Sequence, residues 1–130
     1  MCFSHSKLIY YQQTKKTPHP RWLKTFLADK RGLYRHCFIL THTNLFYTDN
    51  SQISSGNLPL EETLALVKIF STHKVTLVLQ GHDHYRDDQT YDKVRYTVLG
   101  AIADKVKAPE YLKIKVAPEG AAYEWVKIEN

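Results

Sequence analysis

Two short apolar segments separated by an amphipathic segment constrain the fold of this chain most strongly. Residues 36–42 read HCFILTH and residues 75–81 read VTLVLQG. Each is too short for a helix and rich in strand formers, which is typical of strands buried on both faces in a parallel sheet. Between them, residues 60–70 read LEETLALVKIF, with Leu60, Leu64 and Val67 spaced for one face of a helix. This strand, helix, strand order predicts an α/β fold.

A second helix is predicted before the first strand, over residues 21–32. Its apolar residues recur at a spacing that places them on one face, which we expect to lie in the core, and Gly32 is expected to end it. These residues are Trp22, Leu23, Phe26 and Leu27. Residues 43–59 are rich in Ser, Asn, Asp, Gly and Pro and are expected to form a long loop.

The last part of the chain changes to a β-rich pattern. Residues 93–100, 111–116 and 121–128 are expected to be strands, and the APEG turn predicts a hairpin between the last two. We therefore expect one domain over 1–130, with residues 1–20 irregular, an α/β region over 21–101 and a β-hairpin tail over 102–130. The predicted fold class is α/β with an α+β tail. With 43% hydrophobic residues the chain can build a core, which excludes wholesale disorder.

The charge balance favours anionic ligands without identifying one. The chain has 18 basic and 13 acidic residues, a net charge of +5, but the basic residues are scattered. This is compatible with a phosphorylated substrate. A nucleic-acid binder using Tyr91, Tyr96 and Tyr111 for stacking is not expected, since no basic motif interleaves with these tyrosines. No apolar run is long enough for a membrane-spanning helix, so no membrane partner is expected.

Three of the seven histidines follow the predicted parallel strands. His42 ends the first strand, and His82 and His84 come directly after the second. Functional sites gather beyond the carboxyl ends of parallel strands, and neutral imidazole is the commonest side-chain metal ligand. Residues two apart in an extended segment lie about 7 Å apart on one side, so His82 and His84 can serve two metal ions ~3.5–4 Å apart. Asp83 between them is expected to point away and to tie the loop by hydrogen bonds.

These residues resemble a known family. The segment LVLQGHDHY, a strand ending in THTN and the preceding helix RWLKTFL look like the C-terminal half of a calcineurin-like metallophosphoesterase, over roughly residues 20–101. The resemblance implies a partial β-sandwich flanked by helices and phosphoester hydrolysis by metal-activated water. It also implies that His42 and His82 bind one metal ion and His84 the other, with Mn, Fe or Zn as the candidate divalent ions.

The family's carboxylate motifs are absent from this chain. No Asp-x-His, Gly-Asp-x-x-Asp or Gly-Asn-His-Asp/Glu occurs, so the chain is expected to be an incomplete or truncated enzyme that binds metal weakly alone. No catalytic side chain is assigned. Asn44 and Tyr85 are candidate substrate contacts, although Asn44 also suits a turn and Tyr85 also suits packing. The remaining histidines are expected to be surface or structural residues.

Two functions remain open from the sequence. The first is a metal-dependent phosphoesterase acting on a phosphomonoester or phosphodiester. The alternative is a non-catalytic metallophosphoesterase-like module that serves as a binding or scaffold surface. Half of a two-sheet sandwich leaves one sheet face uncovered, so we expect a second copy of the chain or a partner chain to cover it.

Overall fold

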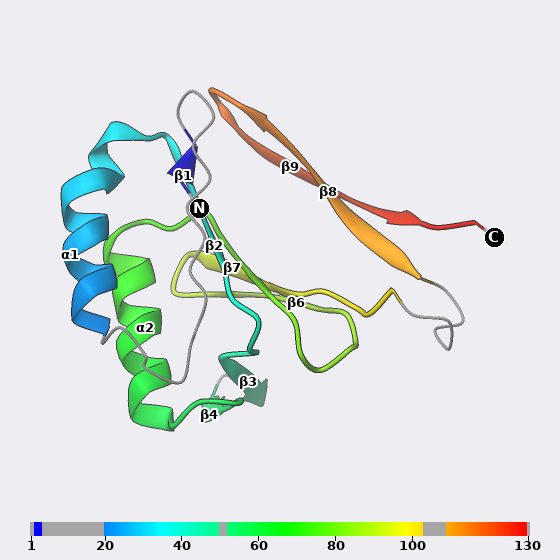
Figure 1. Cartoon of the computed structure of the whole chain (residues 1–130), viewed down its shortest axis with the longest axis horizontal. Coiled ribbons are helices and arrows are strands. Elements are labelled where there is room, and N and C mark those ends of the chain that lie inside the picture. The colour runs from blue at the N-terminus through cyan, green and yellow to red at the C-terminus, as the bar shows by residue number, and fades with distance from the viewer. Residues whose placement is uncertain (1, 4–19, 50–51, 103–108, 130) are drawn as a thin grey trace.

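The protein has a mixed α/β fold (Figure 1). The structure is a computed structural model that describes residues 2–3, 20–49, 52–102 and 109–129. Its elements in chain order are β1 (Cys2–Phe3), α1 (Pro20–Lys30), the 3-10 helix η1 (Arg31–Leu33), β2 (His36–Leu40), β3 (Phe46–Asp49), β4 (Gln52–Ser55), α2 (Leu60–Thr72), β5 (Leu77–Gln80), β6 (Asp87–Tyr91), β7 (Val94–Val98), β8 (Glu110–Ala117) and β9 (Gly120–Lys127).

The central sheet has the strand order β1-β2-β5-β7-β6. Strand β5 pairs in parallel with β2, as the two apolar segments predict, and also pairs in parallel with β7 on its other side. Both strands of the predicted pair are mostly buried, and Cys37 on β2 is fully buried. Strand β6 joins β7 in an antiparallel pair and was not expected, because its sequence DDQTY is polar.

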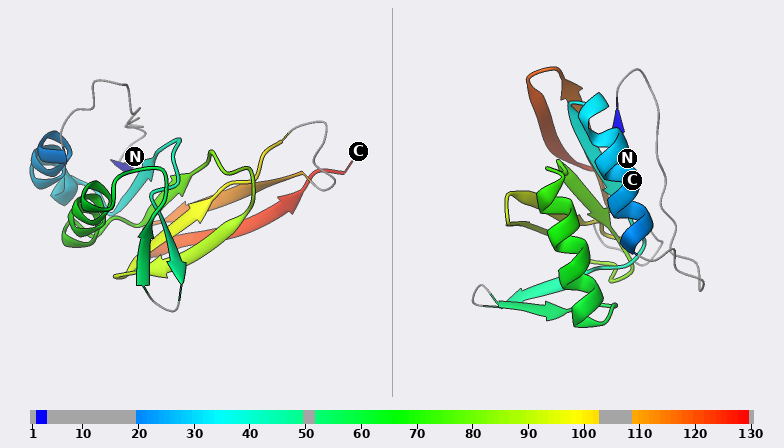
Figure 2. Two further views of the ribbon diagram at one scale, coloured as in Figure 1. Left: turned by 90° about the horizontal axis from the view of Figure 1, so that it is seen from below. Right: turned by 90° about the vertical axis from the view of Figure 1, so that its left-hand side faces the viewer.

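Helices α1 and α2 lie side by side against one face of this sheet (Figures 1 and 2). Leu23 and Leu27 of α1 are buried in the core, with Phe26 packed partly against it. The expectation that Trp22 also belongs to the core is wrong, since 44% of it is exposed and its ring stacks on Phe26. Trp22 lies at the edge of the apolar face of α1, and it packs along the helix instead of reaching the sheet. The α-helix ends at Lys30, and Gly32 lies in η1.

The long loop expected over residues 43–59 contains a hairpin, so that expectation is wrong. Strands β3 and β4 pair antiparallel from Phe46 opposite Ser55 to Asp49 opposite Gln52. Phe46 at the start of β3 is fully buried, whereas most of the segment is polar in sequence. The polar composition of residues 43–59 therefore predicted a loop where two short strands form.

The predicted C-terminal hairpin is confirmed. Strands β8 and β9 pair along their whole length, with Ala117 opposite Gly120 at the turn. Figure 2 shows this hairpin on the side of the central sheet away from the helices. Two arginines fasten it there: the guanidinium of Arg86 lies 4.2 Å from the Trp125 ring centre, and that of Arg95 lies 4.2 Å from the Tyr123 ring centre. The hairpin thus covers part of the second sheet face.

The N-terminal expectation falls mostly outside the described residues. Residues 4–19 of the segment expected to be irregular are not described, whereas Cys2 and Phe3 form β1, which pairs antiparallel with β2. Pro20 begins α1. Neither helix in the described ranges is long and apolar enough to cross a membrane.

Candidate metal site at the carboxyl edge of the central sheet

Parallel pairing brings two of the predicted histidines together. Leu40 on β2 lies opposite Leu79 on β5, so the two strands end level with one another. Two backbone hydrogen bonds extend the pairing past these ends, from Thr41 N–H to the Leu79 carbonyl at 2.9 Å and from Gly81 N–H to the His42 carbonyl at 3.0 Å. His42 and His82 follow directly, and we expected them to meet at this edge for that reason.

The rings of His42 and His82 are in direct contact. His42 Nε2 and His82 Nδ1 are 3.2 Å apart, and the ring centres are 5.2 Å apart with an interplanar angle of 83°. Both side chains are exposed. At this separation the two nitrogens can share one proton in a hydrogen bond, and their lone pairs can instead converge on one cation.

The loop after β5 holds an unusual backbone conformation. His82 has φ 77° and His84 has φ 58°, both in the left-handed region that non-glycine residues seldom occupy. Gly81 precedes them, and a Cβ there would lie 3.3 Å from the His42 carbonyl oxygen, so glycine permits the close approach of the two loops. Strained backbone of this kind concentrates at functional sites.

His84 does not complete a three-ligand cluster with this pair. Across the described ranges, no group of three or more His, Cys, Asp or Glu side chains is placed to hold one metal ion. The expected assignment of His84 to a second metal ion stays a prediction.

Asp83 is the centre of a hydrogen-bond network that ties three loops together. Its Oδ2 accepts hydrogen bonds of 2.9 Å from Asn44 Nδ2 and from the Tyr47 hydroxyl, and its Oδ1 lies 3.5 Å from Asn57 Nδ2. The hydrogen bond from Asn44 is the largest cause of the lowered pKa of Asp83, to which Tyr47, Asn57 and the charge of His82 add while burial opposes. Asp83 is therefore an ionised tie between loops, as its position between two histidines suggested.

A buried polar layer lies beneath this network. The Leu45 N–H donates to Gln80 Oε1 and the Leu45 carbonyl accepts from Thr63 Oγ1, both at 2.9 Å. Gln80, Thr63 and Asn44 are almost completely buried. Among the described side chains, Asn44 Oδ1 and Gln80 Nε2 are buried atoms with no hydrogen-bond partner. One acceptor and one donor next to the loops that carry the histidines can therefore still form hydrogen bonds.

Sequence reasoning missed Tyr47, Thr63 and Gln80. The one available signal was Gln80, a polar residue that ends an otherwise apolar strand. Tyr47 lies in the hairpin that was expected to be a loop, and its hydrogen bond to Asp83 is the main cause of its raised pKa.

The two predicted substrate contacts lie at the same edge. Asn44 is fully buried with its amide nitrogen on Asp83, whereas Tyr85 is 43% exposed. Burial, followed by the neighbouring Tyr47, raises the pKa of the Tyr85 hydroxyl, so it remains protonated at neutral pH. A substrate contact by either residue stays a prediction.

Two of the other four histidines can be compared with expectation, because His5 and His19 lie outside the described residues. The His36 ring Nε2 lies 2.7 Å from the Ala117 carbonyl oxygen and so links β2 to the hairpin, a structural role. His73 is the C-cap of α2, where its N–H donates to the Ile69 carbonyl.

The histidine pair fits a shared metal ion by its donor set and spacing. Imidazole nitrogens bind zinc at about 2.0–2.1 Å, which places two ligands of a tetrahedral ion about 3.3 Å apart. The observed separation is 3.2 Å. Asp83 points its oxygens to Asn44 and Tyr47, so it is not a further ligand in this arrangement.

Fold and site together define a mixed α/β protein with a histidine pair at the carboxyl edge of parallel strands. No protein-family model and no curated protein matches the chain. Among solved structures, the chain is similar to a single mutant of Vps29 from Entamoeba histolytica, with 13% sequence identity, a TM-score of 0.33, and coverage of 92% of this chain and 96% of that one. A likeness at this level assigns neither a family nor an activity.

Proposed function

We propose that the chain binds a divalent transition-metal ion through His42 Nε2 and His82 Nδ1, as the histidine-bearing part of a metallophosphoesterase-type site. The observation that supports this most is the 3.2 Å separation of the two ring nitrogens on adjacent parallel strands.

The chain's own residues hold the ion and orient its ligands. His42 and His82 supply two neutral nitrogens, while Asp83 ties the loop that carries His82 to the segment after His42 through Asn44 and Tyr47. A bound divalent ion supplies Lewis-acid activation for phosphoester hydrolysis. Two neutral ligands do not offset its charge, so hydrolysis requires carboxylate ligands from another polypeptide segment. Phosphorylated compounds are the proposed substrate class.

A non-catalytic binding module is the second candidate. It is favoured by the engagement of Asp83, the nearest carboxylate in sequence, with Asn44 and Tyr47. A site with no available carboxylate binds an ion without hydrolysing a phosphoester. In this case the fold serves as a surface for a partner chain or a second copy.

Metal titration followed by a hydrolysis assay separates these functions. We expect calorimetry with Zn²⁺ or Mn²⁺ to show one site per chain, at least tenfold weaker in His42→Ala and in His82→Ala. The matched control is His73→Ala, at the far end of α2, which should bind as the wild type does. Undiminished binding in both site variants would refute the metal site.

Hydrolysis of p-nitrophenyl phosphate is then measured with the same metal ions, for the chain alone and after adding a polypeptide that carries Asp-x-His and Gly-Asn-His-Asp segments. Turnover that needs the added polypeptide and is lost in His82→Ala supports the phosphoesterase. Metal binding with no turnover under either condition assigns the chain to the non-catalytic module.

A further inference from the structure

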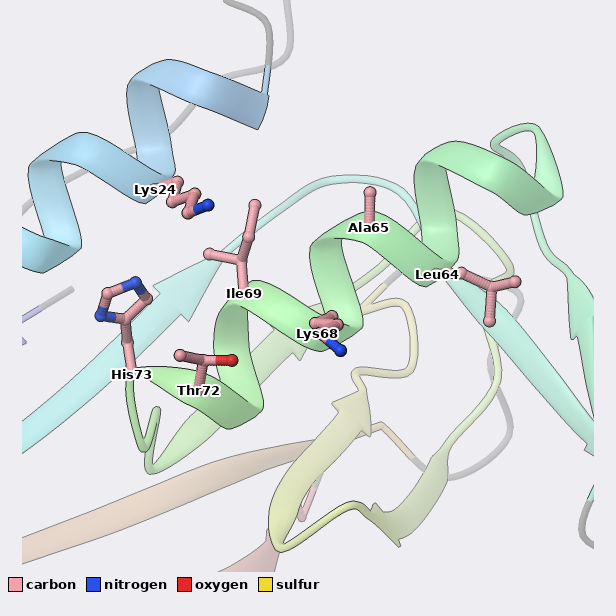
Figure 3. Close-up of a pocket in the computed structure, with 7 residues that line it drawn as sticks. All are labelled: Lys24, Leu64, Ala65, Lys68, Ile69, Thr72 and His73. Carbon is pink, nitrogen blue, oxygen red and sulfur yellow. The ribbon is translucent and has the colours of Figure 1, made fainter.

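A groove between α1 and α2, whose lining includes neither His42 nor His82, has the character of a ligand site. Its cavity volume is about 630 Å³, within the range of small-molecule sites. One stripe of α2 forms its floor, consisting of Leu64, Ala65, Lys68, Ile69 and Thr72. Figure 3 shows Lys24 of α1 and His73 facing this stripe at one end. We call this cavity the α1–α2 groove.

The apolar wall of the α1–α2 groove is open to solvent. Leu64 is 46% exposed, whereas Val67, which the spacing places on the same helical face, is buried. Ile69 belongs to the buried core, so Leu64 is the exposed large apolar side chain among the residues that line the groove. The stripe from Leu64 to Thr72 spans eight residue steps of α2, or about 12 Å at 1.5 Å per residue. The shape therefore suits an extended apolar chain.

The charge of the α1–α2 groove is positive. Two lysines, Lys24 and Lys68, line it together with His73, and no acidic residue is among the described residues that line it. Burial lowers the pKa of His73, and the charges of Lys24 and Arg31 lower it further. The end of the groove at Lys24 and His73 therefore favours a negative group.

We propose that the α1–α2 groove binds a single-chain amphiphilic carboxylate, with the carboxylate at Lys24 and the hydrocarbon chain along Ile69, Ala65 and Leu64. The ammonium at the end of Lys68 reaches solvent while its methylene stem covers the chain. This site is separate from the proposed metal site and does not depend on it.

Other occupants fit the charge less well. Residues 1–19 of this chain carry Lys7, Lys15 and Lys16 and no acidic residue, so their sequence offers no negative side chain to pair with Lys24. Two copies docked face to face would bring the same lysines together. A helical peptide needs apolar walls from both sides of a groove, but α1 contributes only Lys24 to this one.

Chemical-shift mapping with dodecanoate, below its micelle concentration, tests the proposal. We expect shifts confined to Lys24 and residues 64–73, and a rise in the titration midpoint of the His73 ring as the carboxylate binds. Dodecanoate should bind up to about 15-fold more tightly than decanoate, since each buried methylene is worth about fourfold in affinity. Decyltrimethylammonium, which has a chain without the carboxylate, should bind at least tenfold more weakly than decanoate.

Two variants test the two ends of the α1–α2 groove separately, and both alter exposed side chains. Lys24→Glu should weaken dodecanoate at least tenfold, and Leu64→Ser should remove most of the advantage of dodecanoate over decanoate. The control is Lys115→Glu on the exposed side of β8, with the same change in charge as Lys24→Glu. It should bind dodecanoate no more than twofold more weakly than wild type.

Several results would overturn the proposal. They are shifts centred elsewhere, equal affinity for the anionic and cationic chains, or binding that survives Lys24→Glu. Binding of an acidic amphipathic peptide without binding of dodecanoate would assign the groove to a protein partner instead. Self-association that Lys24→Glu abolishes would assign it to a second copy.

Discussion

Replacing Gly56 with alanine should destabilise the fold beside the candidate metal site. A Cβ at this position would lie 2.5 Å from the Asn44 carbonyl oxygen, 2.9 Å from the Leu45 carbonyl carbon and 2.9 Å from the Phe46 nitrogen. All three are backbone atoms, so no side-chain rotation relieves the overlap. The segment beginning at Gly56 must therefore move away from residues 44–46.

The size of the effect follows from two contributions. Forcing an extra methyl group into packed structure costs about 1–3 kcal/mol. The displacement also weakens the hydrogen bonds from Gly56 N–H to the Leu45 carbonyl at 3.1 Å and from Asn57 N–H to the Asn44 carbonyl at 3.0 Å. Losing one of them costs about 1 kcal/mol. We expect the free energy of unfolding to fall by about 2–4 kcal/mol.

Urea denaturation followed by tryptophan fluorescence measures this change. Gly32→Ala is the matched control, because a Cβ at Gly32 meets no atom within 4 Å, and it should alter stability by less than about 0.5 kcal/mol. The slope of the unfolding free energy against urea concentration should stay the same, which would show that the substitution changes stability without changing the compactness of the unfolded state. If Gly56→Ala were as stable as Gly32→Ala, the close approach of the two segments would be refuted.

Three further changes test the packing and the charges. Thr63→Val should cost about 1–2 kcal/mol in urea denaturation, since it removes a buried hydrogen bond to the Leu45 carbonyl; a cost below about 0.3 kcal/mol would contradict this. Leu27→Ala should cost about 2–5 kcal/mol and Trp22→Ala less than about 1 kcal/mol, because only Leu27 is buried, and equal costs would contradict this assignment. Burial raises the pKa of Asp88, but hydrogen bonds from an arginine and a threonine of β7 outweigh it and the pKa is lowered. The stabilisation is therefore present above the ordinary aspartate pKa of about 3.9 and lost as the pH falls through the lowered value. The stability advantage of wild type over Asp88→Asn should shrink between pH 6 and pH 2, and a constant difference would refute the pairing.

The main elements were predictable because they depend on local patterns. Apolar runs indicated β2 and β5, and their parallel pairing followed from the intervening helix. That pairing was enough to bring His42 and His82 to one edge of the sheet. The APEG turn likewise indicated the β8–β9 hairpin.

Two hairpins with polar strands and the contacts between distant residues were not predictable from apolar patterns. Strand β6 is polar and exists because β7 offers it a free edge, and β3 pairs with β4 in a segment with little apolar content. Tyr47 reaches Asp83 only because the hairpin folds toward the loop after β5. The exposure of Trp22 depends on how α1 sits against the sheet, which the periodicity of the helix alone does not determine.

Imidazole ¹⁵N spectra of His42 and His82, with and without Zn²⁺, test the shared metal site most directly. The 3.2 Å separation predicts that saturating Zn²⁺ removes the proton between the rings and shifts His42 Nε2 and His82 Nδ1 together to values of metal-bound nitrogen. Persistence of a protonated nitrogen between the two rings in the presence of saturating Zn²⁺ would contradict the metal site and leave the pair as a hydrogen bond.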